Sequence, residues 1–128
     1  MNTSLKRKTV LLVGDRYFIQ NELAEFFQVH GYSVVSVGSA KEEIAAGISM
    51  KPELILVDYE MGHNDPYLVT TIFHMALPAS MIGIMNGNLR HCDSDHAKSA
   101  GAAKVLNRSC EASAFNEVVH DSEEQVLF

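Results

Sequence analysis

The sequence has few cysteines and no long apolar run. Its two cysteines, Cys92 and Cys110, do not form a Cys-x-x-Cys pair, so neither a disulfide framework nor a zinc module is indicated. The first apolar run, Val10 to Val13, is much too short for a signal-peptide core or a membrane span, and no later run reaches the required length. We therefore expect a cytoplasmic protein with reduced thiols and no membrane contact.

Basic residues are also scarce, because 10 lysines and arginines stand against 16 acidic residues, giving a net charge of −6. The only basic cluster, Lys6-Arg7-Lys8, is smaller than the positive surface that usually grips a nucleic acid. Hydrophobic residues make up 47% of the chain, which is typical of a globular domain rather than a disordered segment. We expect no nucleic-acid partner and a single domain over residues 1–128, with its core at about 8–121.

Five short runs rich in apolar and β-branched residues predict five strands. Three of them are almost continuously apolar, as strands must be when both faces of a parallel sheet are covered. The strands are expected at Thr9–Val13, Ser33–Val37, Leu54–Val57, Met81–Met85 and Ala103–Leu106.

The segments between the strands carry helical patterns. Gly31 is expected to end the first helix, and Ser39 to cap the second. Helices are expected at about 19–30, 40–50, 66–77 and 89–100 and from 111 onward. The third helix is expected to point Leu68, Ile72 and Met75 inward, and Pro78 follows it as a breaker.

Alternating strands and helices predict an α/β fold with a doubly wound, five-stranded parallel sheet in a three-layer arrangement. In such folds the functional site lies at the carboxyl ends of the strands, beside the point where strand order reverses. Asp15 and Asp58 at strand ends can hold a hard divalent cation such as Mg²⁺, while Arg108 can neutralise a phosphoryl group. The residues that follow or end the strands are Gly14-Asp15, Asp58, Asn86-Gly87 and Asn107-Arg108.

Three segments, together with their spacing, resemble the receiver domains of two-component response regulators. They are Val10-Leu-Leu-Val-Gly-Asp15, Leu54-Ile-Leu-Val-Asp-Tyr-Glu-Met61 and Gly101-Ala-Ala-Lys-Val-Leu-Asn-Arg108. The resemblance covers nearly the whole chain and implies the flavodoxin-like (βα)5 receiver fold. It further implies that Asp58 accepts a phosphoryl group from a sensor histidine kinase or a phosphotransfer protein. Asn86 and Arg108 would then stand at the family's hydroxyl and lysine positions, and Asp15, Asp58 and the backbone carbonyl of Glu60 would bind Mg²⁺.

The resemblance also implies partners. A downstream protein would dock on the face formed by the fourth helix, the fifth strand and the fifth helix, from about Leu89 to Val119, where receivers commonly form homodimers. A receiver takes part in a phosphorelay and has no turnover substrate. We therefore do not expect a conventional enzyme.

Several positions depart from the family's pattern. Gly14 replaces one of two acids after the first strand, which should weaken Mg²⁺ binding. Asn86 replaces a serine or threonine, Arg108 replaces a lysine with a rigid fork, and Val105 replaces the switch aromatic. Together these changes favour an alternative reading, a pseudo-receiver that binds a partner protein without being phosphorylated.

Other interpretations of single residues remain open. Asp58 can be a strand-end acid without chemistry, Asp15 can cap the first helix, and Arg108 can form a salt bridge with Asp58. A zinc site at His91, Cys92 and His96 lacks an evident fourth ligand. A flavin or dinucleotide site is disfavoured, because the turn after the first strand lacks the Gly-x-Gly-x-x-Gly series.

Overall fold

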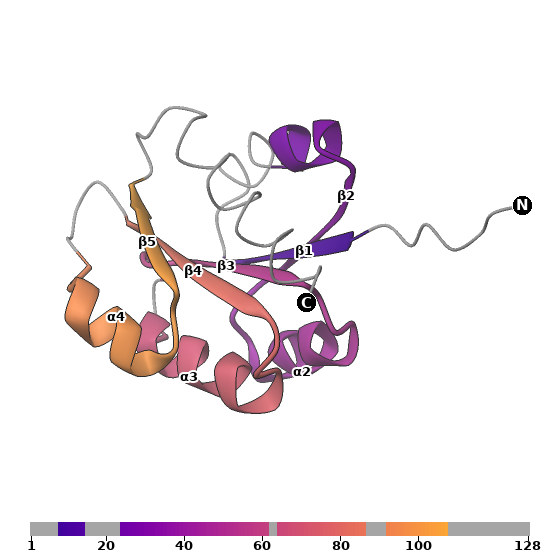
Figure 1. Cartoon of the computed structure of the whole chain (residues 1–128). Coiled ribbons are helices and arrows are strands. Elements are labelled where there is room, and N and C mark those ends of the chain that lie inside the picture. The colour runs from indigo at the N-terminus through magenta and orange to yellow at the C-terminus, as the bar shows by residue number, and fades with distance from the viewer. Residues whose placement is uncertain (1–7, 15–23, 62–63, 87–91, 108–128) are drawn as a thin grey trace, which may run out of the picture.

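The structure, a computed structural model, describes residues 8–14, 24–61, 64–86 and 92–107. Within these ranges strands alternate with helices (Figure 1). The strands are β1 (Lys8–Val13), β2 (Tyr32–Val37), β3 (Leu54–Asp58), β4 (Met81–Asn86) and β5 (Lys104–Asn107). The helices are α2 (Lys41–Ser49), α3 (Pro66–Ala76) and α4 (Ser94–Ala100), and residues 24–29 are also helical. Every predicted strand is confirmed to within one residue at each end.

The five strands form one parallel sheet in the order β2-β1-β3-β4-β5. Because the chain first moves outward from β1 to β2 and then returns to β3, strand order reverses between β1 and β3. Ligands of such sheets bind beside this point, at the carboxyl ends of the strands. The predicted doubly wound parallel sheet is therefore confirmed.

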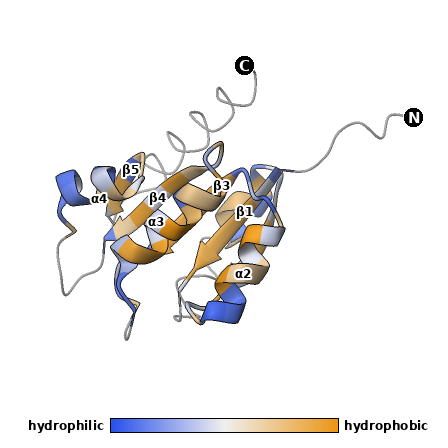
Figure 2. Cartoon of the chain, turned by 90° about the horizontal axis from the view of Figure 1, so that it is seen from below, coloured by the Kyte–Doolittle hydropathy of each residue, from blue (hydrophilic) through white to orange (hydrophobic). Residues whose placement is uncertain are grey.

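The central strands are buried because helices cover both faces of the sheet. Figure 1 shows α2, α3 and α4 on one side of the sheet and residues 24–29 on the other. Phe27 and Tyr32 pack into the apolar cluster on one face, whereas Ile44, Phe73 and Ala97 pack into the cluster on the other. In Figure 2 the central strands carry the hydrophobic colours, and blue appears on the helices and connections. This two-sided burial explains why the strand sequences are continuous apolar runs.

The start of α2 differs from the prediction that Ser39 caps it. The N-cap residue is Ala40, which makes no side-chain capping bond. Ser39 is instead buried, and both its hydroxyl and its carbonyl oxygen accept hydrogen bonds from Asn64 Nδ2, at 2.7 and 3.2 Å. The predicted cap is therefore wrong, because Ser39 joins the β2–α2 connection to the β3–α3 connection.

The inward face of α3 was also predicted wrongly. Leu68, Ile72 and Met75 are 57, 38 and 77% exposed, while Val69 and Phe73 are buried. Both stripes follow a helical spacing of three and four, so the pattern alone does not separate them. The stripe that contains Phe73 faces the sheet, and its aromatic side chain fills the apolar cluster there.

The ends of the other helices are set by capping groups. α4 begins at Ser94, later than predicted, because the Asp93 carboxylate accepts from the backbone N–H groups of Asp95 and His96. Gly31, with φ of +87°, follows the helical residues 24–29 and confirms the predicted stop. The predicted fifth helix lies outside the described residues, as does the predicted first helix before residue 24. In the described part of the chain, no helix has the length and apolarity that crossing a membrane requires.

Candidate functional site

The sheet brings Gly14, Asp58 and Asn86 together along the line formed by the carboxyl ends of its strands, called the edge below. Val13 pairs with Val57 between β1 and β3, so Gly14 and Asp58 are the next residues on the two strands. Asp58 in turn pairs with Met85 between β3 and β4, one position before Asn86. All three residues therefore stand at the carboxyl ends of adjacent strands, as predicted, next to the point where strand order reverses.

Asp58 is a buried carboxylate with a fixed orientation. Its side chain belongs to the last residue of β3 and is only 5% exposed. Oδ1 accepts a hydrogen bond from the backbone N–H of Glu60 at 3.0 Å, and the next residue, Tyr59, donates its N–H to the Met85 carbonyl at 2.9 Å. The backbone of Tyr59 and Glu60, directly after Asp58, thus holds the carboxylate in place.

Gly14 lies directly against Asp58. Its N–H donates to the Val37 carbonyl at 2.9 Å, which keeps the backbone in line with β2. A Cβ atom added at Gly14 would lie 2.8 Å from the Asp58 Cβ and 3.4 Å from Oδ2. Such a contact is too close for two carbon atoms, so the acid that a receiver usually has at this position would not fit without a shift of the strands.

Asn86 connects the same edge to the start of α4. Its side chain is 9% exposed, and Oδ1 accepts from the backbone N–H of Cys92 at 2.6 Å. The oxygen of the carboxamide therefore holds the segment that precedes α4, and its NH2 group is a hydrogen-bond donor. An amide nitrogen in this position is a group that can donate to a phosphoryl oxygen.

Three predicted groups remain untested by the geometry. Asp15 and Arg108 lie outside the described residues, although each directly follows a described strand-end residue, Gly14 and Asn107 respectively. Glu60 is half-buried, and its predicted role as a metal ligand through the backbone carbonyl stays a prediction.

Among the described residues of this end of the sheet, Asp58 supplies a carboxylate that could contribute to a divalent-cation site. Asp58 is a buried carboxylate at the edge, and Mg²⁺ is commonly held by one or two carboxylates together with phosphate oxygens and water. Among the residues that the structure describes, no group of three or more His, Cys, Asp or Glu side chains is placed to hold a metal ion. Of the predicted zinc ligands, His91 lies outside the described residues. The His96 ring is stacked on Tyr67, and Cys92 Sγ lies 3.7 Å from the Asp93 carbonyl oxygen, so these two side chains are engaged in other contacts.

Solved structures share this architecture. The chain superposes on a CheY-like response regulator receiver domain protein of Methanospirillum hungatei with a TM-score of 0.80 and 18% identity, covering 94% of this chain and 97% of that one. A CheY-like receiver domain of Methylobacillus flagellatus gives a TM-score of 0.77 at 13% identity, with 91% and 99% coverage. The chain has the receiver fold.

A third structure is informative about chemistry in this fold. It is a response regulator of Burkholderia pseudomallei with a phosphorylated aspartic acid, a calcium ion and citrate, and it matches with a TM-score of 0.75 and 21% identity over 91% of this chain and 72% of that one. No protein-family model matches the sequence, and no curated protein matches it either. The likeness to receivers is therefore one of fold, at low sequence identity.

An aromatic cluster that lies next to Asp58 was not predicted from the sequence. Tyr59, Tyr67 and His96 come from the end of β3, from α3 and from α4. The Tyr67 ring stacks on His96, with ring centroids 3.8 Å apart and planes 7° apart, and meets the Tyr59 ring edge-on at 5.5 Å. No local pattern predicts contacts between elements that lie so far apart in sequence, although Asp65-Pro66 and Asp93-Ser94 are recognisable helix starts.

Partial burial shifts the pKa of two groups here, the Tyr67 hydroxyl and the neighbouring Cys92 thiol. Burial raises the pKa of Tyr67 above its usual range, and the hydrogen bond to Tyr59 raises it further. Burial likewise raises the pKa of the Cys92 thiol; the hydrogen bond with Tyr67 acts in the opposite direction, and the charge of Asp93 adds to the rise. Both groups therefore stay protonated at neutral pH, and Cys92 is not an activated nucleophile.

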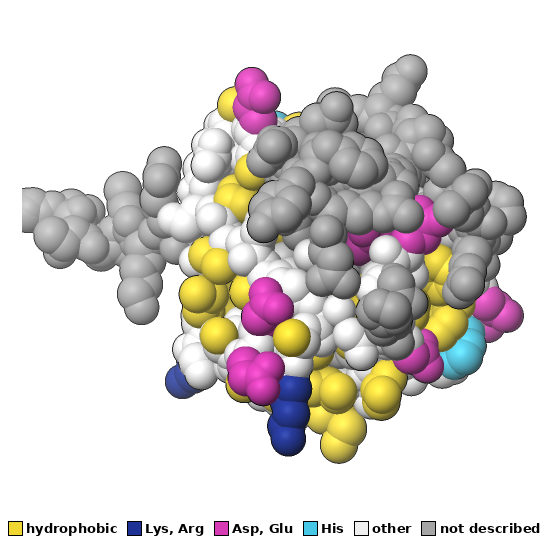
Figure 3. Space-filling model, turned by 180° about the vertical axis from the view of Figure 1, so that it is seen from behind, with side chains coloured by type: hydrophobic (Ala, Val, Ile, Leu, Met, Phe, Trp, Pro, Cys, Tyr) yellow, Lys and Arg dark blue, Asp and Glu magenta, His cyan; other side chains and the backbone are white. Residues whose placement is uncertain are grey.

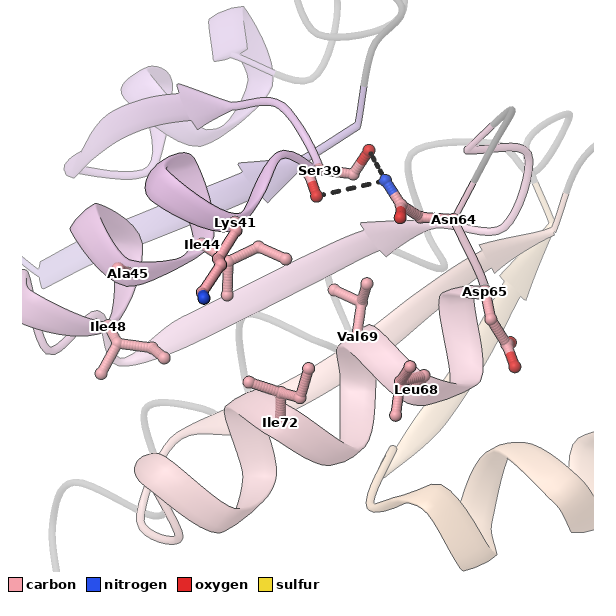
Figure 4. Close-up of a pocket in the computed structure, with 10 residues that line it drawn as sticks. All are labelled: Ser39, Lys41, Ile44, Ala45, Ile48, Asn64, Asp65, Leu68, Val69 and Ile72. Atoms are coloured by element: carbon pink, nitrogen blue, oxygen red, sulfur yellow. Dashed lines mark hydrogen bonds between the residues drawn. The ribbon is translucent and has the colours of Figure 1, made fainter.

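A separate apolar groove of about 410 Å³ runs between α2 and α3. Figure 4 shows Ile44 and Ile48 of α2 facing Val69 and Ile72 of α3, with the Ser39–Asn64 hydrogen bonds at one end. In Figure 3 hydrophobic side chains gather along the lower edge of the molecule, with acidic side chains on either side. Leu68 and Ile72, two of the residues predicted to face inward, contribute to its apolar lining.

Proposed function

We propose that the chain is a receiver module of two-component signalling and accepts a phosphoryl group on Asp58. The donor would be a phosphohistidine of a sensor histidine kinase or of a phosphotransfer protein. The observation that carries this proposal is the buried Asp58 carboxylate, held at the end of β3 beside the reversal of strand order. The phosphorylated aspartic acid in the Burkholderia pseudomallei response regulator supports it, because that protein has the same fold.

The transfer itself needs one carboxylate oxygen. An oxygen of Asp58 attacks the phosphorus atom, a P–O bond forms and the P–N bond to the histidine breaks. The electron pair of that bond stays on the imidazole nitrogen, which then takes a proton. The product is an acyl phosphate on Asp58 and a neutral histidine on the donor, so the chain is a phosphoryl acceptor and not an enzyme with a turnover substrate.

Neighbouring groups of the chain would hold the phosphoryl oxygens. The NH2 group of Asn86 would donate to one oxygen, and the Arg108 guanidinium would balance the negative charge. Asp15, Asp58 and the Glu60 carbonyl would hold Mg²⁺, which supplies positive charge against the phosphoryl group. Binding of Mg²⁺ would be weaker than in receivers with two acids directly after the first strand, because Gly14 supplies no carboxylate.

The output surface would be α4, β5 and the segment that follows β5. A downstream protein would dock there, and a second copy of the chain could use the same face to form a homodimer. We place this module in the cytoplasm, where it would meet the kinase.

A second function is favoured by two contacts at the edge. Gly14 leaves no room for an acid beside Asp58, and the Asn86 oxygen is already bonded to the Cys92 N–H. Both contacts suit an edge that keeps one conformation. They support the alternative proposal of a pseudo-receiver, which binds its partner protein regardless of phosphorylation.

Amide NMR with Mg²⁺ and beryllofluoride, a mimic of the phosphoryl group, separates the two proposals. A phospho-acceptor should give saturable shifts at Gly14, Asp58 and Asn86 that require Mg²⁺ and vanish in Asp58→Asn. The matched control is Asp65→Asn, which alters another aspartate and retains a good helix cap, so its shifts should match those of the wild type. If millimolar Mg²⁺ and beryllofluoride produce no shift in the wild type, phosphoryl transfer to Asp58 is rejected in favour of the pseudo-receiver.

A further inference from the structure

Tyr67 connects the edge that carries Asp58 to the start of α4. Its hydroxyl accepts a hydrogen bond from the backbone N–H of Asp93 at 3.0 Å and donates to the Tyr59 hydroxyl at 3.4 Å. Its ring lies flat against the ring of His96 in the first turn of α4. One side chain on α3 therefore contacts both the residue after Asp58 and the N-cap residue of α4.

Both ends of this connection are fixed in the structure. Tyr59 follows Asp58 directly, and its N–H is bonded to the Met85 carbonyl on β4. Asp93 is the N-cap of α4, and its carboxylate accepts from the N–H groups of Asp95 at 2.9 Å and His96 at 3.2 Å. Tyr67 thus joins Tyr59 to a residue on which the first turn of α4 depends.

A second connection reaches the same segment from the sheet edge. Asn86 holds the Cys92 N–H through Oδ1, one residue before Asp93. A phosphoryl group on Asp58 would attract the NH2 end of this carboxamide, and any rotation that brings the NH2 group closer moves Oδ1 relative to Cys92. The Tyr67 hydroxyl would then decide how far the change at Cys92 passes into α4, because it holds the adjacent N–H.

We propose that Tyr67 is a positioning residue that couples the state of the Asp58 edge to α4. This inference rests on the proposed receiver function and adds the route by which its output face would respond. Receivers usually have a hydroxyl and a switch aromatic at two positions, which Asn86 and Val105 occupy here. In this chain the proposed connection to α4 uses Tyr67 of α3 instead. Coupling of this kind needs two arrangements of α4 whose balance depends on the edge.

Tyr67→Phe isolates the hydroxyl. It keeps an aromatic ring for stacking on His96 and for the edge-on contact with Tyr59, but it removes the acceptor for the Asp93 N–H and the bond to Tyr59. Asp93 is exposed, so water can replace the lost acceptor and the variant should fold. The matched control is Tyr32→Phe, which removes a tyrosine hydroxyl from the apolar cluster on the opposite face of the sheet.

The experiment measures how far a change at Asp58 reaches α4. Asp58→Asn is introduced into the wild type, into Tyr67→Phe and into Tyr32→Phe, and the amide shift differences at Asp95, His96 and Ala97 are compared within each background. We expect these differences to fall by about half or more in the Tyr67→Phe background and to stay unchanged with Tyr32→Phe, because only the first variant removes the hydroxyl that joins Tyr59 to Asp93 and coupled sites respond non-additively. Equal differences in all three backgrounds, or none at α4 in the wild type, would overturn the role of Tyr67.

Repeating the measurement with Mg²⁺ and beryllofluoride in place of Asp58→Asn separates this proposal from the receiver function. If the ligands produce no shifts at Asp58 in the wild type, the phospho-acceptor function fails, and the Asp58→Asn comparison still decides the role of Tyr67. If the ligands shift Asp58 and Asn86 in both backgrounds but α4 only when the Tyr67 hydroxyl is present, both proposals are supported. If α4 shifts equally with and without that hydroxyl, the function stands and the coupling through Tyr67 is rejected.

Discussion

Gly14 and Asp58 lie against each other across β1 and β3, and this contact limits the chemistry of the edge. A glycine at the first position after β1 lets the two backbones approach until a Cβ would be 2.8 Å from the Asp58 side chain. A glycine here supplies no carboxylate, so under the proposed function position 14 adds no negative charge for a cation. Gly14 therefore has two consequences: it supplies no carboxylate, and it allows the close contact between β1 and β3.

Gly14→Ala should lower the free energy of unfolding by about 1–3 kcal/mol, because the new methyl group overlaps the Asp58 Cβ in a packed edge. Gly83→Ala in β4 is the matched control. There the closest atom is the terminal Cδ2 of Leu56 at 3.0 Å, which can move, so the cost should be smaller. Urea unfolding of the two variants gives the comparison. A Gly14→Ala variant as stable as the wild type would show that the edge yields more easily than its packing indicates.

At the level of elements, the strands could be predicted and the buried face of α3 could not. A strand buried on both sides must be apolar at nearly every position, and the runs from Val10 to Val13 and from Leu54 to Val57 leave little ambiguity. α3 is apolar on more than one face, and only contact with the sheet selects Val69 and Phe73 over Leu68 and Ile72. Helix starts failed where tertiary contacts intervened, as when Ser39 bonds to Asn64 instead of capping α2.

The same reasoning applies to the candidate site. Asp58 and Asn86 were located correctly because position at a strand end follows from the strand assignment and the parallel sheet. The Tyr59–Tyr67–His96 cluster was missed because its members meet only after three separate elements have packed. Residues placed by one element were predictable, whereas contacts among several elements were not.

The orientation of α3 can be tested with neighbouring substitutions. Val69→Ala should cost about 1–3 kcal/mol, because it leaves a cavity in the cluster under α3, where Val69 is 3% exposed. Leu68→Ala should cost less than about 1 kcal/mol, since Leu68 is 57% exposed. Denaturant unfolding gives the order of the two stability losses from the midpoints, provided that the free energy of unfolding depends on denaturant with the same slope in both variants. The reverse order would mean that α3 is rotated to the face expected from its sequence.

For the molecule as a whole, the raised pKa values of Cys92 and Tyr67 predict lower stability in alkaline solution. Unfolding returns both groups to water, where they lose their protons at a lower pH than in the fold. The unfolded state therefore binds fewer protons over this window, and the free energy of unfolding falls as pH rises above about 9, the ordinary range of a thiol. Below that pH both groups are protonated in both states and make no such contribution.

Urea unfolding between pH 7 and pH 10.5 measures this dependence. The decline of the wild type should become shallower in Cys92→Ala and in Tyr67→Phe, because each variant removes one group that titrates differently in the two states. Cys110→Ser is a suitable comparison for the cysteine variant, as it removes the other thiol. A decline unaffected by either variant would place its origin in other groups.

Ligand binding at Asp58 should also be visible in the stability of the whole chain. A ligand that binds only the folded state stabilises it by about 2.7 kcal/mol at 100 times its Kd, so Mg²⁺ with beryllofluoride should raise the melting temperature of a working receiver with the logarithm of the beryllofluoride concentration above the Kd. Under the proposed function the effect should require millimolar Mg²⁺ and should be much smaller with either component alone. Asp58→Asn should remove the stabilisation and Asp65→Asn should retain it. Equal stabilisation of wild type and Asp58→Asn would place binding elsewhere on the molecule, while none in the wild type would leave constitutive partner binding as the function that this edge supports.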